Sequence, residues 1–91
     1  MKNKIAIESL SMDLLRVALG YHRGSEKMAE RFLKEALLRC SEVELSKIKP
    51  YFVQIISRIQ SSLSSSDKQK ISEDALMYSI LCKNYSRKYL I

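Results

Sequence analysis

The sequence has 91 residues, of which 46% are hydrophobic and 29% charged, and it carries a formal net charge of +6 at pH 7. This length supports one domain with a single modest core, and the composition argues against a disordered chain. No apolar run approaches the roughly 18 to 20 residues of a membrane span, and Glu8 interrupts the apolar stretch that a signal peptide would need. We therefore expect one cytoplasmic domain spanning residues 1–91.

The chain contains only two glycines and one proline, which favours long helices over a turn-rich β protein. We predict an all-α fold, a compact bundle of four main helices. A capping-box pattern, Ser41 followed three residues later by Glu44, predicts a fifth short helix near residues 42–48. A straight continuation of the second helix through this segment is the alternative.

The first helix is predicted over residues 7–22, with one wide apolar arc. Four small or polar positions fall on its opposite side: Ser9, Asp13, Arg16 and Gly20. Gly24 suits the left-handed turn that ends a helix, and Ser25 suits the N-cap of the next one. The second helix is amphipathic up to Cys40, with Leu38 alone on its charged face. The short connection predicts that these two helices form an antiparallel hairpin.

The segment Pro50–Leu63 is the most continuous apolar stretch in the chain, and we predict a helix there. Pro50 fits the first helical turn, where its missing N–H costs nothing. The apolar positions fall within one broad arc at the helical period: Tyr51, Phe52, Val53, Ile55, Ile56, Ile59 and Leu63. A helix this apolar needs cover on more than one side, so we place it in the middle of the bundle.

Serine fills most of residues 61–66, which predicts a solvated connector. Ser66 and Gln69 form a second capping-box pattern, so the last helix is expected to begin near Asp67 and to continue to about Arg87. A heptad-like stripe follows one of its faces: Ile71, Ala75, Tyr78, Cys82, Tyr85 and Tyr89.

The last helix has a second apolar face, which includes Leu76, Met77 and Ile80. Two interpretations compete for it. Either the helix packs between two neighbours of its own chain, or this face binds another molecule. A second copy of the chain is one such partner, because twofold pairing is the commonest way to bury an apolar remainder. An unidentified protein is the other.

The positive charge lies mainly in the second half of the chain, which has a balance of +5 against +1 in residues 1–45. Three basic residues near the C-terminus alternate with two tyrosines: Lys83, Tyr85, Arg87, Lys88 and Tyr89. Basic side chains interleaved with aromatic ones are typical of nucleic-acid surfaces. A helix C-terminus also favours cations for structural reasons, and the tyrosines fit the apolar stripe. Nucleic-acid binding is therefore the alternative prediction.

Catalytic patterns are lacking in the sequence. Its single histidine, His22, stands at a predicted helix end, and no serine, cysteine or acid recurs beside it. Cys40 and Cys82 have no metal-ligand spacing and are predicted to be free, buried thiols. Two isolated glycines make no phosphate-binding loop. We predict a non-enzymatic helical protein-interaction or regulatory module without a cofactor or metal ion, which self-associates in one interpretation.

Overall fold

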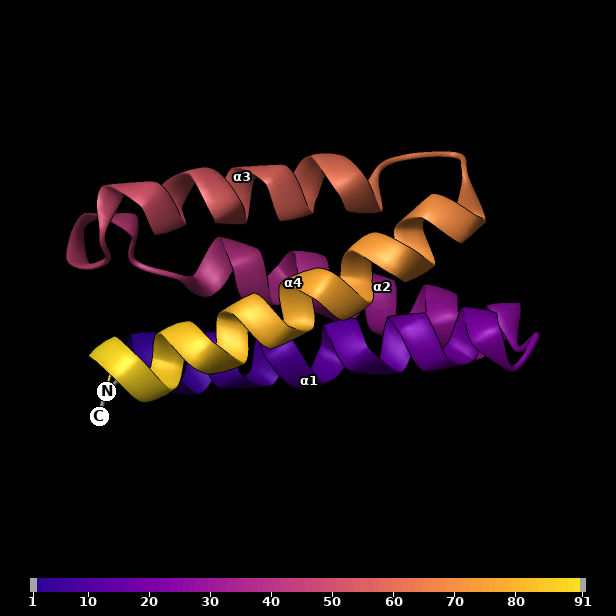
Figure 1. The fold of residues 1–91 in the computed structure, drawn as a ribbon, viewed down its shortest axis with the longest axis horizontal. Helices are drawn as coiled ribbons and strands as arrows, with labels where there is room; N and C mark the ends of the chain where they lie inside the picture. The colour runs from indigo at the N-terminus through magenta and orange to yellow at the C-terminus, as the bar shows by residue number, and fades with distance from the viewer. Residues whose placement is uncertain (1, 91) are drawn as a thin grey trace.

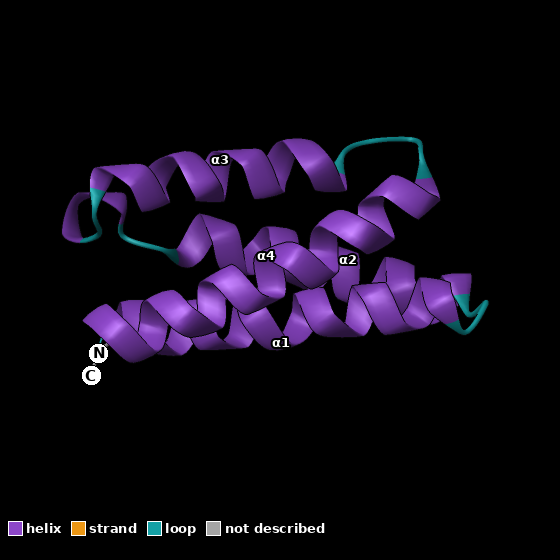
Figure 2. Ribbon diagram, viewed as in Figure 1, coloured by secondary structure: helices purple, strands orange, loops and turns teal. Residues whose placement is uncertain are grey.

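The protein is an all-α bundle, and helices with short loops account for the described part of the chain, residues 2–90 (Figure 2). The computed structural model has five elements: α1 (Lys2–His22), α2 (Glu26–Glu42), the 3₁₀ turn η1 (Leu45–Lys47), α3 (Pro50–Leu63) and α4 (Lys68–Tyr89). The four main helices and the short helix near residues 42–48 are thus confirmed. Across residues 2–90, no helix combines the length and the apolar character needed to cross a lipid bilayer.

Successive main helices run antiparallel to one another (Figure 1). α1 packs against α2 and α4, while α3 packs against the same two helices from the other side. The bundle measures 36 × 20 × 18 Å. α1 and α3 therefore occupy opposite edges of the molecule, and α2 and α4 lie between them.

α3 has the predicted bounds, but it does not lie in the middle of the bundle, so that prediction was wrong. One stripe of the helix is buried: Phe52, Ile56, Ile59 and Leu63. Tyr51 remains 51% exposed, and Val53 and Ile55 are only partly buried. The apolar arc of this helix is wider than the surface that its two neighbours cover. An apolar sequence alone therefore did not identify the most covered helix.

α1 is covered on two sides, including a side that the sequence had placed outside. Asp13 and Gly20 are both buried, although they were predicted to lie opposite the apolar arc. Gly20 lies against α2, where a Cβ at this position would be 2.8 Å from the backbone nitrogen of Ala29. The absence of a side chain at Gly20 thus lets the backbones of α1 and α2 approach closely.

α1 begins five residues earlier than the predicted start at Ile7. Asn3 fixes this first turn through two hydrogen bonds to the backbone of Glu44, just before η1. The Asn3 side-chain nitrogen donates to the Glu44 carbonyl at 3.1 Å, and the Glu44 N–H donates to the Asn3 side-chain oxygen at 2.8 Å. These partners are 41 residues apart in the sequence, so local pattern could not reveal the contact.

Small residues also mediate the contact between α1 and α4. The Ser11 hydroxyl donates to the carbonyl oxygen of Ser79 at 2.8 Å, and the Ser79 hydroxyl donates to the carbonyl oxygen of Ser11 at 2.9 Å. Two helical turns away along the same contact, the Ser72 hydroxyl donates to the Ala18 carbonyl at 3.3 Å. These reciprocal bonds satisfy buried hydroxyls and hold the two helices close together.

The two predicted capping boxes are wrong. Ser41 lies within α2, and its hydroxyl donates to the Leu38 carbonyl. Asp67 rather than Ser66 caps α4, because the Asp67 carboxylate accepts the Lys70 N–H at 3.1 Å. Ser25 does occupy the N-cap position of α2, without a side-chain cap bond. Gly24 has a φ of +76°, which confirms the predicted left-handed turn.

Candidate interaction surface

An apolar groove of about 400 Å³ runs between α1 and α4 on the outside of the bundle. Its walls come from both helices, and Ser11 and Ser79 lie at the contact between them. The lining residues are Glu8, Ser11, Met12, Leu15, Leu76, Ser79, Ile80, Lys83 and Arg87. We call this surface the α1–α4 groove.

The groove is open because of how α4 divides its residues. Mostly small side chains face α1 or the core: Ser72, Ala75, Ser79, Cys82 and Ser86. The larger apolar side chains flank this row and remain outside. Leu76, Met77 and Ile80 are 47%, 45% and 52% exposed, so the second apolar face of α4 is not covered by the protein's own helices.

α1 contributes exposed apolar side chains that were not predicted. Met12 is 50% exposed and lines the groove. Ile5, which lies two helical turns earlier on the same side of α1, is 67% exposed. Ile5 had been placed before the first helix, and the pairing of α1 with α4 was unknown. Because α1 pairs with α4, the exposed side chains of Met12, Leu76 and Ile80 line one groove.

Charged side chains lie at one end of the α1–α4 groove. Glu8 comes from α1, and Lys83 and Arg87 come from α4. All three are exposed, and none of them forms an ion pair with another part of residues 2–90. The groove thus combines an apolar centre with charges whose partners are not supplied by the described chain.

The predicted basic and aromatic residues do not form a single surface. Lys83 and Arg87 belong to the α1–α4 groove, whereas Lys88 lies on the side of α4 that faces α3. Tyr89 is 39% exposed, with the ammonium groups of Lys49 and Lys88 4.8 and 5.3 Å from its ring centroid.

Tyr85 belongs to the core rather than to the surface. It is 4% exposed, and its ring stacks on Phe52 with 4.0 Å between centroids. Its hydroxyl accepts the backbone N–H of Lys49 at 2.9 Å. The ring therefore has no free face to offer a nucleotide base, and it joins the C-terminal part of α4 to the start of α3.

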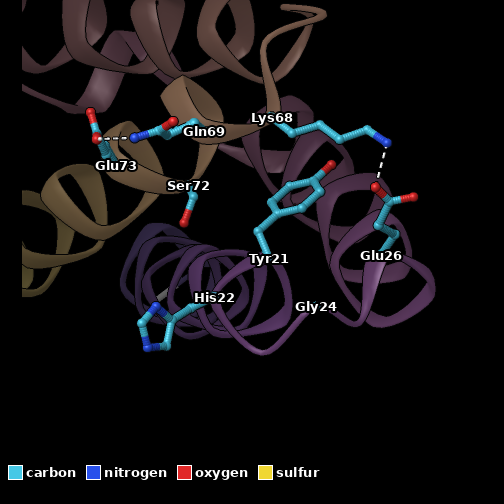
Figure 3. Close-up of a pocket in the computed structure, with 8 residues that line it drawn as sticks. All are labelled: Tyr21, His22, Gly24, Glu26, Lys68, Gln69, Ser72 and Glu73. Atoms are coloured by element: carbon cyan, nitrogen blue, oxygen red, sulfur yellow. Dashed lines mark hydrogen bonds and ion pairs between the residues drawn. The ribbon is translucent and has the colours of Figure 1, made fainter.

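A second, more polar pocket of about 720 Å³ lies where α1, α2 and α4 meet (Figure 3). Lys68 and Glu26 form an ion pair across it, and the Tyr21 ring lies beside this pair (Figure 3). His22 points away from these groups (Figure 3), and the Ser72 hydroxyl is already donated to Ala18. This arrangement does not pair a nucleophile with a base, as acid–base or covalent catalysis would require.

Asp13 is the one buried carboxylate of α1, at 4% exposure. Burial raises the pKa of its carboxyl above the ordinary value of 3.8, and the nearby Glu35 raises it further. Arg39 and Arg16 oppose this rise, each with a guanidinium nitrogen 3.8 Å from an Asp13 oxygen. These charged groups lie between α1 and α2, and the ion pair of Asp13 with Arg39 connects the two helices.

Cys40 and Cys82 are free and buried, as predicted. Burial raises the pKa of each thiol to about 12, so neither is an activated nucleophile. Within residues 2–90, no three histidine, cysteine, aspartate or glutamate side chains gather in a way that could hold a metal ion. Comparison of the chain with protein-family models, with curated proteins and with solved structures found no match.

Proposed function

We propose that this protein is a small, non-catalytic interaction module that binds a helical protein segment in the α1–α4 groove. The observation that carries the proposal is the concentration of exposed apolar side chains on this face. Of the ten large hydrophobic residues exposed among residues 2–90, Met12, Leu76 and Ile80 line the groove, and Ile5 and Met77 lie on the same two helices. Contiguous apolar patches on small proteins commonly mark binding sites.

A helix is the partner whose shape fits this surface best. Two antiparallel helices form the walls, and a third helix can lay an apolar stripe between them in the manner of helix-in-groove recognition. Met12 and Met77 add flexible side chains that adapt to a partner's surface. Glu8, Lys83 and Arg87 provide charges at the edge of the groove, where they select orientation. The two free thiols favour a reducing, cytoplasmic setting for this binding.

Site-specific photo-cross-linking in living cells tests the proposal. A photoreactive residue at Met12 should give adducts of discrete mass, and Ile80→Lys on the opposite wall should abolish them. The matched control is the same residue at Leu38, which is 55% exposed on α2, outside the groove. Equal labelling from Met12 and Leu38, or adducts that persist in Ile80→Lys, would overturn the proposal.

Nucleic-acid binding is the second candidate. The partly exposed ring of Tyr89, which lies near the ammonium groups of Lys49 and Lys88, favours it. In that case, binding of short DNA or RNA should weaken as salt rises. If a base stacks on the ring, Tyr89→Ala should then weaken binding of the nucleic acid by about 1 to 3 kcal/mol. Fluorescence anisotropy at two salt concentrations measures both effects. The interaction-module proposal expects only weak binding that Tyr89→Ala leaves unchanged.

A further inference from the structure

We infer that the helix bound in the α1–α4 groove is α4 of a second copy of this chain, packed antiparallel about a twofold axis at Ile80. This inference rests on the proposed function and names its partner. It follows from the order of residues along the exposed face of α4 and from the charges that the single chain leaves without partners.

The exposed face of α4 is centred on Ile80. Seven residues before Ile80 lies Glu73, and seven residues after it lies Arg87, so all three share one side of the helix. All three are exposed. In an antiparallel pair related by a twofold axis at Ile80, a residue on this line lies opposite the one equally far on the other side of Ile80. Glu73 of each copy then lies opposite Arg87 of the other.

The same register also matches the positions between these charges. Leu76 and Lys83 flank Ile80 on the same side of the helix, so Leu76 lies beside Lys83 of the second copy, where the aliphatic stem of the lysine covers the leucine and the ammonium group reaches solvent. Met77 and Asn84 flank Ile80 on the other side, so Met77 lies beside Asn84 of the second copy, and the two Ile80 side chains meet at the axis. The centre of the interface is thus apolar, and each of its two ends carries one Glu73–Arg87 pair.

The single chain leaves these charges available. Within residues 2–90 neither Glu73 nor Arg87 forms an ion pair, although Lys68 and Lys70 on the same helix do. Among the described residues, the Glu73 carboxylate accepts one side-chain hydrogen bond, a long contact of 3.5 Å from the Gln69 amide. A parallel arrangement of the two helices would instead place Arg87 opposite Arg87, so the charges select the antiparallel one.

The broad side of the molecule is large enough for a standard dimer interface. A standard interface buries about 800 Å² on each partner. The Cα atoms of the bundle extend over 36 × 20 Å on its broad side, which leaves room for an interface of this size. The accessible surface of the chain is 5702 Å², so such an interface would cover about one-seventh of it.

Sedimentation velocity of the purified protein at micromolar concentration tests the inference. The wild type should sediment as a dimer, and Ile80→Lys should give a monomer. Glu73→Arg and Arg87→Glu should each weaken dimerisation about tenfold, because each replaces two attractive pairs with two repulsive ones. The double variant Glu73→Arg/Arg87→Glu restores both pairs in reversed order and should recover the wild-type dissociation constant. Lys34→Glu, on the exposed face of α2, is the control and should leave dimerisation unchanged.

A wild-type protein that stays monomeric would overturn the inference, and so would a double variant that is no tighter than the single ones. Circular dichroism melts verify that every variant folds. A monomeric protein that still gives Met12 adducts in cells would refute self-pairing and leave the interaction module standing. A wild-type protein that neither dimerises nor gives Met12 adducts would refute the two proposals together.

Discussion

α1 and α3 lie on opposite edges of the same bundle and are held there in different ways. α1 makes close backbone contacts through small residues, with Gly20 against Ala29 and Ser11 against Ser79. α3 packs less closely on its neighbours, and large side chains such as Phe52 fill the space. The contacts of α1 should therefore be sensitive to added atoms, and those of α3 to removed atoms.

The largest effect is expected at α3, from Phe52→Ala. Phe52 has no exposed surface and stacks on Tyr85, so its removal leaves a cavity at the point where α3 meets α4. Such truncations cost about 3–5 kcal/mol of unfolding free energy. Arg58→Ala, on the exposed side of α3, should change it by about 0.5 kcal/mol or less. Guanidinium unfolding of both variants measures the difference, and similar losses would refute the assigned orientation of α3.

At α1 the informative change is an enlargement, Gly20→Ala. Alanine favours an isolated helix over glycine by about 1 kcal/mol, so propensity alone predicts a more stable protein. Here the new Cβ would lie 2.8 Å from backbone nitrogen and 2.9 Å from the Cα of Ala29, and one helix must shift. We expect a net loss of about 1–3 kcal/mol. A gain in stability would show that α1 and α2 are not so closely packed.

Gly24→Ala is the companion to that experiment, since space around Gly24 is open but its φ is +76°. The cost there comes from the left-handed backbone and should be about 1 kcal/mol. Together the two variants separate a steric requirement for glycine from a conformational one.

The smallest effect concerns the buried acid between α1 and α2. Because the pKa of Asp13 is raised on folding, the folded protein binds more protons than the unfolded one between pH 3.8 and the raised pKa. The contribution of Asp13 to stability therefore falls as pH rises through that interval. Asp13→Asn lacks this titration, so its stability relative to wild type should increase from pH 4 to pH 7. Unfolding curves at several pH values check the trend, and a constant or decreasing difference would contradict it.

Most of the fold could be predicted because it depends on local pattern. Pro50 and the serines after Leu63 delimit α3, and Gly24 marks the turn between α1 and α2. The start of α1 could not be predicted, since it depends on the contact of Asn3 with Glu44, which folding alone brings together. The burial of Asp13 was missed for a similar reason, because a polar residue in a periodic pattern is normally assigned to solvent.

The candidate site was predicted only on the α4 side. Leu76, Met77 and Ile80 could be found because a single helix carried more apolar surface than one contact covers. Met12 and Ile5 could not, since nothing in the sequence pairs α1 with α4. Tyr85 was assigned to two roles from the sequence, and its stacking on Phe52 places it in the core.

Alkylation of the two buried cysteines would report how often parts of this bundle open. At pH 8 a thiol with a pKa of about 12 is ionised in only about one molecule in ten thousand, and both sulfurs are shielded from reagents. Alkylation must therefore wait for the structure to open. Cys40 reports openings that expose α2, and Cys82 reports those that expose α4. The ratio of the two labelling rates would show whether the helices of this bundle separate one at a time or all together.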